Sequence, residues 1–417
     1  MKSLIWLSTV WILSILAFPS ACLALDIAVT HEDELQVNPA LSLRDVLNAT
    51  VKHQPQQAQL QSQAYGVKAK KALADSFLPY SPAISLYHQN DTLGSGRGER
   101  EYEAALELPI WLPNQQDARA KVADISGRYF EAGQASLSIR AAGLLRDALW
   151  EIALTKNVLL LAEVKLVSAK RLQEKVNRSV LAGVAATTDF LLAQQATLLA
   201  SKNKVLAQAE VMHAQFRYKL VTGIDQLPES YKEQKSELIG FEQSPTWLEM
   251  LTKVESAEQS RHLAQIEKKE NVQVQINARS IIGAFDTKYN QSMGVSVRIP
   301  FNIAASTTPI TAASEMALGS ALSERDILRN ALEAALHEAD HNLEVSEQAL
   351  LIAKQHDAIA KKSLRLAEKA YALGEYDLAT LLRIKDQAFE AERSYRATEI
   401  QHQWNIARYN QAVGVLP

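Results

Sequence analysis

The sequence has little cysteine, few aromatic residues and no marked excess of charge of either sign. The single cysteine, Cys22, excludes an internal disulfide and a cluster of thiolate metal ligands. The formal net charge of −3 excludes a strongly basic nucleic-acid-binding protein. Hydrophobic residues make up 47% of the chain, whereas aromatic residues make up only 6%. Because Ala and Leu supply much of this hydrophobic content, the composition favours helices and a sizeable core.

Proline is absent from two long stretches, 114–227 and 310–416. Because proline breaks the interior of a helix, its absence permits very long helices there. Hydrophobic residues recur every seven positions in both stretches, a pattern typical of coiled coils. They are Leu145, Ile152, Leu159 and Leu166 in the first stretch, and Val345, Ile352, Ile359, Leu366 and Leu373 in the second. A continuous helix over 119–182 would contain ~64 residues and measure ~95 Å, which predicts a rod rather than a compact globule.

The one long apolar run stands at the N-terminus. Lys2 precedes apolar residues over 4–17, and small residues follow at Cys22 and Ala24. This pattern predicts a secretory signal peptide over 1–24 and an N-terminal linker over 25–40. Two alternatives stay open: a buried N-terminal helix, and a lipoprotein that is cut before Cys22. The run is shorter than the ~20 residues that span a bilayer and no other segment is as apolar, so any membrane crossing must use strands.

The chain repeats itself at a constant interval. Four pairs of motifs correspond, namely Leu108-Pro109-Ile110 with Ile299-Pro300-Phe301, Gly183 with Gly374, Arg217-Tyr218 with Arg408-Tyr409, and Gly223 with Gly414. The members of every pair are 191 positions apart. This constant separation indicates an internal duplication. We therefore expect a first structural repeat over 41–228, a linker over 229–245 and a second structural repeat over 246–417.

Segments that alternate apolar and polar residues precede both proline-free stretches. They are clearest at 102–108, 272–279 and 293–299, with a weaker one around Ile84 and Leu86. Such alternation gives a strand one apolar and one polar face. In a soluble protein the apolar face packs on a core, whereas in an exported protein with aromatic residues near the strand ends it suits a membrane barrel. Four strands cannot close a barrel, because the smallest have about eight, so several chains must contribute.

Taken together, these motifs resemble the TolC-type outer-membrane efflux channels, the outer-membrane factor family. The matching segments are 43–47 (LRDVL), 106–113 (LELPIWLP), 181–183 (LAG) followed by 189–193 (DFLLA), 372–374 (ALG) followed by 380–382 (TLL), and 407–414 (ARYNQAVG). Each motif is short, but their order, spacing and duplication are specific. The resemblance extends from about Leu41 to Gly414, and the segment 108–113 is most similar to the heavy-metal-exporting branch.

The resemblance implies a mainly α fold with a membrane β-barrel. Long antiparallel coiled-coil helices would form an α-barrel tunnel, and four strands per chain would be completed into a barrel by trimerisation. The implied location is the outer membrane, in contact with its lipid, with a long periplasmic extension. The implied partners are two other copies in a homotrimer, a periplasmic adaptor (membrane fusion protein) and an inner-membrane pump of the resistance-nodulation-division type.

The function implied by the resemblance is the outer-membrane channel of a tripartite efflux system. It would conduct substrate passively from the adaptor and the pump to the exterior, with metal cations as one cargo. No catalytic residue, no cofactor and no nucleic-acid partner are expected. A second class of protein, a periplasmic coiled-coil adaptor or scaffold, stays open as the alternative. Such a protein would share the heptads but would not need two alternating hairpins.

The resemblance also assigns roles to the residues around Gly183 and Gly374. The adaptor-docking tips would be Leu181, Ala182, Gly183 and Val184 in the first repeat, and Leu373, Gly374 and Glu375 in the second. Glycine also suits a reversal between two long helices, which commonly needs a left-handed residue. The candidates for the tunnel entrance are Asp189, Asp377, Thr380 and Arg383. Some relatives place acidic rings six and nine residues after the second glycine, where this chain has Thr380 and Arg383. An arginine there weakens the attraction of cations.

One motif does not belong to this resemblance. The segment His337-Glu338-Ala339-Asp340-His341 matches the H-E-x-x-H pattern, in which two histidines on one helical face bind zinc and the glutamate acts as a base. The flanking acidic residues instead indicate a solvated helix face. No pattern of a catalytic domain surrounds the motif, so we expect neither a protease nor a resident metal. Adventitious metal binding stays an alternative.

Overall fold

A computed structural model describes residues 35–301 and 303–417 of the chain. The predicted signal peptide, Cys22 and most of the predicted N-terminal linker lie outside these residues. The helices are α1 (Leu43–His53), α2 (Gln56–Ala74), α3 (Gln115–Leu181), α4 (Thr187–Thr222), α5 (Pro245–Glu267), α6 (Ala304–Ala372) and α7 (Leu378–Ala412). The strands are β1 (Gln36–Asn38), β2 (Ala83–Asn90), β3 (Arg100–Pro109), β4 (Gln226–Pro228), β5 (Gln273–Ile282) and β6 (Asn290–Arg298).

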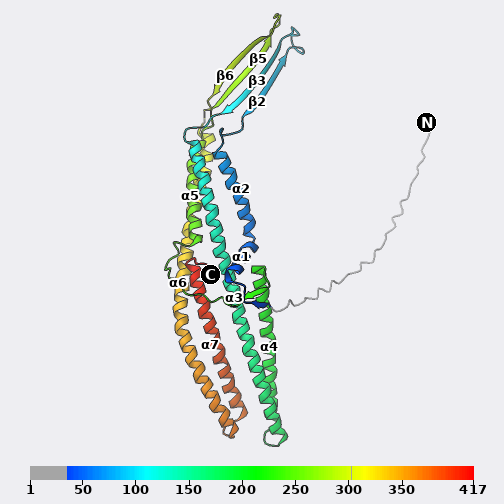
Figure 1. The fold of residues 1–417 in the computed structure, drawn as a ribbon, viewed down its shortest axis with the longest axis vertical. Coiled ribbons are helices and arrows are strands. Elements are labelled where there is room, and N and C mark those ends of the chain that lie inside the picture. Colours follow the sequence, from blue (N-terminus) through cyan, green and yellow to red (C-terminus); the bar gives the residue numbers. More distant parts are fainter. Residues whose placement is uncertain (1–34, 302) are drawn as a thin grey trace, which may run out of the picture. The chain divides into compact units, whose positions relative to one another are not determined.

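The prediction of two very long helices is confirmed. The helix α3 has 67 residues and α6 has 69 residues. Each is followed by a turn and a returning helix, α4 or α7, and each is preceded by a hairpin of two strands (Figure 1). The series helix, strand, strand, long helix, returning helix therefore occurs twice, first from α2 to α4 and then from α5 to α7.

The four long helices form one layer in the order α4, α3, α7, α6. In this layer α3 packs against α4 to form a first helical hairpin, and α6 packs against α7 to form a second. Contacts between α3 and α7 join the two helical hairpins. A cluster of buried apolar side chains near the helical turns connects both hairpins: Leu172, Val176, Ala193, Ala367, Leu378 and Leu381. A second cluster joins α1 to α3 and α4 and includes Val46, Leu145, Ile152 and Tyr218. The helices α4 and α6 are thus the two outer helices of the layer.

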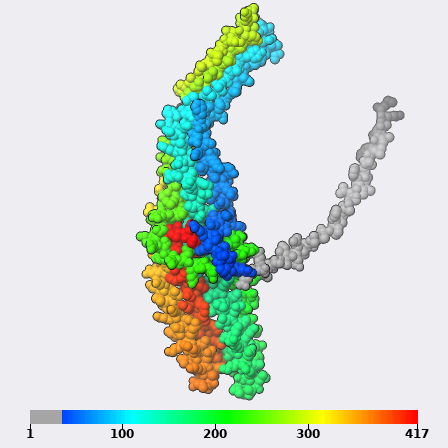
Figure 2. Space-filling view, viewed as in Figure 1, coloured from blue at the N-terminus to red at the C-terminus, as the bar shows by residue number. Residues whose placement is uncertain are grey.

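Four of the strands form an antiparallel sheet in the order β2-β3-β5-β6. The sheet continues from the ends of the helices that lie opposite the two helical turns (Figure 1). In the view of Figure 2, no helix covers it. A short parallel pair between β1 and β4, whose register joins Val37 to Leu227, was not predicted from the sequence. Strands of three residues carry too few side chains to show alternation.

A buried polar network fixes the segment 229–245 between the two repeats. The side chain of Arg146 on α3 donates to both carboxylate oxygens of Glu233, from Nε at 2.8 Å and from Nη2 at 2.6 Å. The same guanidinium donates to the side chain of Gln411 at 2.6 Å and to the carbonyl oxygen of Val415 at 2.9 Å. Asn410 donates to Glu233 at 2.9 Å. The network therefore ties α3, the segment 229–245 and the C-terminal end of α7 together.

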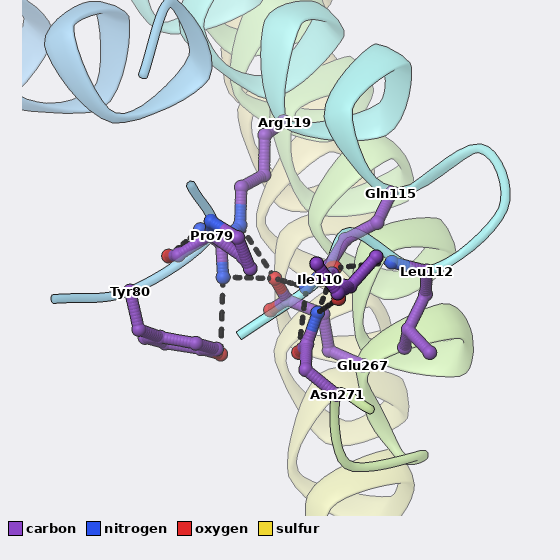
Figure 3. Close-up of polar contacts among 8 residues, drawn as sticks. All are labelled: Pro79, Tyr80, Ile110, Leu112, Gln115, Arg119, Glu267 and Asn271. Carbon is purple, nitrogen blue, oxygen red and sulfur yellow. Dashed lines mark hydrogen bonds and ion pairs between the residues drawn. The ribbon is translucent and has the colours of Figure 1, made fainter. Parts of the chain in front are cut away.

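A second polar network lies where the sheet meets the helices (Figure 3). The guanidinium of Arg119 on α3 donates to Glu267 of α5 at 2.6 Å, to the carbonyl oxygen of Pro79 at 2.9 Å and to the hydroxyl of Tyr80 at 3.0 Å. Gln115 also donates to Glu267, at 3.0 Å, and accepts a hydrogen bond from Asn271 at 2.7 Å. The network therefore fastens α3, which follows strand β3, to α5, which precedes strand β5, at the base of the sheet.

Candidate functional site

The sheet has one apolar face and one polar face. Residues that pair across antiparallel strands point to the same side, and successive residues of a strand point to opposite sides. The register therefore gathers on one face Ile84, Leu86, Ala104, Leu106, Leu108, Val274, Ile276, Ala278, Met293, Val295 and Val297. The opposite face carries Ser85, Glu101, Glu103, Glu107, Gln275, Asn277, Arg279, Ser292 and Ser296. All four strands share this division.

Large side chains of the apolar face are left uncovered by the residues that the structure describes. The exposed fractions of Leu86, Met293 and Val295 are 80%, 83% and 71%. A contiguous exposed apolar surface of this kind indicates a surface that contacts lipid or another protein. The soluble alternative, in which the apolar face packs on a core of the same chain, is not what the structure shows for these strands.

The polar face holds charged groups that interact across strands. Arg279 on β5 forms an ion pair with Glu101 on β3 at 2.5 Å. Two residues away along the same strands, Asn277 donates to Glu103 at 2.8 Å. Ser296 on β6 donates to Gln275 at 3.1 Å. Such a surface is compatible with water and unsuited to lipid, because charged side chains are costly in hydrocarbon.

Both turns between long helices adopt the same conformation. Gly183 has a φ of 73° and Gly374 has a φ of 78°, the left-handed region that favours glycine. In the first turn the N–H of Gly183 donates to Val180 and that of Val184 donates to Ser179, both at 2.9 Å. This pair of bonds is the Schellman motif, which ends a helix.

The second turn repeats the motif. Gly374 donates to Tyr371 at 3.2 Å and Glu375 donates to Ala370 at 2.9 Å. Apolar side chains project into solvent at both turns, since the exposed fraction of Leu181 is 80% and that of Leu373 is 76%. The structure thus places all seven predicted tip residues, 181–184 and 373–375, in two matching turns with exposed apolar groups.

The four candidates for the tunnel entrance divide into two sites. Asp377 caps the N-terminus of α7, where its carboxylate accepts a hydrogen bond from the N–H of Thr380 at 2.8 Å. Asp189 on α4, by contrast, lies close enough to Tyr371 on α6 to affect the pKa of its phenol. Burial raises the pKa of the Tyr371 phenol above its usual value, and the negative charge of Asp189 raises it further. Asp189 on α4 thus acts on a residue of α6, whereas Asp377 and Thr380 order the start of α7.

The cap at Asp377 makes a pH-dependent contribution to stability. Hydrogen bonds from Thr380 lower the pKa of Asp377 below its usual 3.8, and the guanidinium of Arg383 lowers it further. Since the folded-state pKa is lowered, the stabilisation is present above about pH 3.8 and is lost as the pH falls through the folded-state pKa. We expect Asp377→Ala to lower the thermal midpoint at neutral pH, with a smaller deficit in acid. Asp377→Asn, which can still cap a helix, should keep more of the midpoint. An equal deficit of Asp377→Ala at both pH values would contradict this account.

Two apolar stripes run along the outer helices of the layer. The α4 stripe consists of Leu191, Leu192, Leu198, Leu199, Val205 and Leu206, whose exposed fractions range from 40% to 64%. The α6 stripe consists of Val345, Ile352, Ile359 and Leu366, whose exposed fractions range from 49% to 68%. Both stripes repeat every seven residues, the spacing by which a helix packs into a coiled-coil partner. The heptads of α6 were predicted from the sequence, whereas those of α4 were not, although apolar pairs such as Leu191-Leu192 and Leu198-Leu199 recur there at the same spacing.

The described residues hold no evident metal centre and no helix that would cross a bilayer. Within 35–301 and 303–417, no group of three or more His, Cys, Asp or Glu side chains is placed to hold a metal ion. Over the same residues, no helix combines the length and the apolar content that a transmembrane helix requires.

Comparison with known proteins finds matches to the structure of this chain but none to its sequence. No protein-family model matches the chain, and no curated protein matches it. Several solved structures superpose on most of it. VceC, an outer membrane protein of Vibrio cholerae, matches with a TM-score of 0.72, 11% identity and coverage of 89% of this chain and 96% of that chain. This chain has the TolC-like fold.

Two further channels extend the agreement on the TolC-like fold. The MtrE outer membrane channel of Neisseria gonorrhoeae matches with a TM-score of 0.70 and 12% identity, over 89% of this chain and 88% of that chain. The CmeC outer membrane channel of Campylobacter jejuni matches with a TM-score of 0.71 and 11% identity, over 89% and 85%. The TolC-like fold thus includes both the long helices and the four-stranded sheet. The predicted fold class, mainly helical with long antiparallel helices and four strands in the sheet, is confirmed.

Proposed function

We propose that the chain is the outer-membrane channel of a tripartite efflux system, in which it conducts substrate passively. The observation that carries this proposal is the division of the four-stranded sheet into an exposed apolar face and a charged face. Turned outward, the apolar face would contact the lipid of the outer membrane. The charged face would then line a water-filled passage, and the long helices would continue this passage through the periplasm.

The edges of the chain support a closed ring of copies. The sheet ends in β2 at one edge and β6 at the other, and the helical layer ends in α4 and α6. In the sheet and in the helical layer alike, one edge belongs to the first repeat and the other edge to the second. Joining the first-repeat edge of one copy to the second-repeat edge of the next is a head-to-tail contact, which generates a ring when the rotation closes. We infer three copies, so that four strands per chain complete one barrel.

The exposed stripes provide a direct test of this ring. We expect Ile359→Glu, in the middle of the α6 stripe, to prevent association, because a carboxylate would be buried against the α4 stripe of the next copy. Lys354→Glu, at an exposed polar position of the same helix, is the matched control and should assemble as the wild type does. The mass of the detergent-extracted particle measures both. Wild-type mass for Ile359→Glu would show that the α6 stripe is not the contact.

The helical tips would dock onto a periplasmic adaptor, which connects the channel to an inner-membrane pump. The support for this assignment is the pair of matching turns with exposed Leu181 and Leu373. We expect Gly374→Leu to abolish export while the assembled protein stays in the membrane, because leucine is strained at a φ of 78° and would distort the turn. Gly374→Asn is the control, since asparagine tolerates this conformation. Export by Gly374→Leu at the wild-type rate would remove Gly374 from the docking surface.

A decisive experiment combines envelope fractionation with the mass of the extracted protein. The channel proposal expects a particle of three chains from the outer membrane. The alternative, an exported coiled-coil adaptor or scaffold, expects a soluble or inner-membrane species of one or two chains. The exposed apolar sheet face favours the channel, because a scaffold has no use for it.

Three further expectations stay predictions: the repeats over 41–228 and 246–417, a pump of the resistance-nodulation-division type, and metal cations as cargo. Passive conduction needs no catalytic residue or cofactor in the channel.

A further inference from the structure

A pair of histidines on α6 belongs to none of the surfaces described so far. His337 and His341 are four residues apart and both are exposed. Their imidazole rings are almost parallel, with an interplanar angle of 6° and ring centroids 6.4 Å apart. Residues at this spacing are neighbours on one face of a helix, with their Cβ atoms about 5–6 Å apart. The two rings therefore lie side by side on the surface of α6.

The packing of α6 determines which way this face is turned. Leu336 and Leu343 pack against Tyr409 of α7 and against Val413, the residue that follows α7. Ala339, which stands between the two histidines, is buried as well. The apolar side of this stretch thus faces α7 and leaves both imidazoles accessible to solutes.

The surroundings of the pair are negatively charged. Four acidic residues lie on the same stretch of helix: Glu333, Glu338, Asp340 and Glu344. Arg329 forms an ion pair with Glu333 at 2.9 Å, and Lys235 forms one with Asp340 at 3.4 Å. Two of the four carboxylates therefore have a basic partner at hand, and a net negative charge surrounds the imidazoles. A negative local field raises the local concentration of cations.

The same geometry does not build a protease centre. A catalytic zinc site uses three protein ligands and keeps one position open for water or substrate. No group of three or more His, Cys, Asp or Glu side chains in the part of the chain that the structure describes is placed to hold a metal ion. The H-E-x-x-H segment is therefore a pair of nitrogen ligands on an open helical surface.

We propose that His337 and His341 together bind one divalent transition-metal ion, each through one ring nitrogen, with water completing the coordination. Neutral imidazole suits Cu²⁺, Ni²⁺ and Zn²⁺, whereas Mg²⁺ and Ca²⁺ prefer oxygen ligands. The affinity should follow the usual order for nitrogen sites, in which Cu²⁺ binds more tightly than Ni²⁺ or Zn²⁺. Both ligands come from one stretch of α6, so the pair is complete within a single chain.

The test is a calorimetric titration of the purified full chain, without a polyhistidine tag, with copper(II) chloride near neutral pH. We expect one ion per chain and a loss of affinity of about tenfold or more in either His337→Ala or His341→Ala. His356→Ala is the matched control, because His356 is exposed on the same helix but has no histidine four residues away in either direction. This control should bind copper as the wild type does, and magnesium chloride should give no saturable binding at the pair.

Three results would overturn the proposal. They are the absence of saturable copper binding by the wild type, wild-type affinity in the variant that lacks both histidines, and an equal loss in His356→Ala. Circular dichroism of each variant shows whether α6 is intact. Both alanine substitutions lie at exposed helical positions, so we expect the wild-type spectrum in the absence of metal.

Discussion

Replacing Arg146 by alanine is expected to lower the free energy of unfolding by about 3–5 kcal/mol, because the substitution leaves a buried carboxylate without its cation. Arg146 and Glu233 are only 3% and 8% exposed, so water cannot replace the lost guanidinium. The substitution also removes the hydrogen bonds to Gln411 and to the carbonyl oxygen of Val415. Unfolding in urea, followed by circular dichroism, measures the change.

A matched control is available elsewhere on α3 and α4. Arg217 donates to both carboxylate oxygens of Glu151, at 2.9 Å and 2.7 Å, and so has the same two-pronged geometry as Arg146. Its side chain is 45% exposed and that of Glu151 is 37% exposed. Exposed pairs contribute about 0–1 kcal/mol, so Arg217→Ala should change stability little. Similar losses for the two alanine variants would show that burial is not the reason for the effect.

The second large effect is expected at Val295, in the middle of β6. Val295 pairs with Ile276 and belongs to the exposed apolar face of the sheet. If this face contacts lipid, an arginine there costs about 2–4 kcal/mol near the bilayer midplane. We expect Val295→Arg to reduce sharply the amount of assembled protein in the outer membrane. Quantitative immunoblotting of fractionated envelopes measures that amount.

The neighbouring residue provides the control for this prediction. Ser296 pairs with Gln275 on the polar face and donates to its side chain. Ser296→Arg introduces the same charge one position further along, where a water-filled passage accommodates it. We therefore expect wild-type levels of assembled protein. A loss in Ser296→Arg together with normal assembly of Val295→Arg would mean that the two faces have been assigned the wrong way round.

Much of the fold could be predicted from the sequence because its patterns are long. Heptads such as Val345, Ile352 and Ile359, in a stretch without proline, predict long helices by themselves. The separation of 191 positions between Gly183 and Gly374, shared by three other pairs of motifs, predicted an internal duplication. The alternation around Val295 predicted a strand with two different faces. These properties depend on near neighbours in the chain, so they are visible before the chain folds.

Other features depend on residues that are far apart in sequence. Nothing in the sequence around Arg146 indicates that it meets Glu233 and Gln411, because the three residues lie on separate segments. Likewise, Asp189 could be grouped with Asp377 by its distance from a glycine, but the packing of the hairpins brings it to Tyr371 instead. Spacing along a helix gives a face but does not say what packs against that face.

The sequence by itself determined the long helices, the two-faced strands, the glycine turns and the duplication, since each follows from the local period of apolar residues or from the backbone freedom of a single residue. Only the tertiary structure decided the register that gathers Ile84, Leu106, Ile276 and Val295 on one face of one sheet. It also decided which heptads are buried and which stay exposed on α4 and α6. The physical reason is that burial depends on the order in which helices and strands pack, which is set by the sum of many contacts between distant segments.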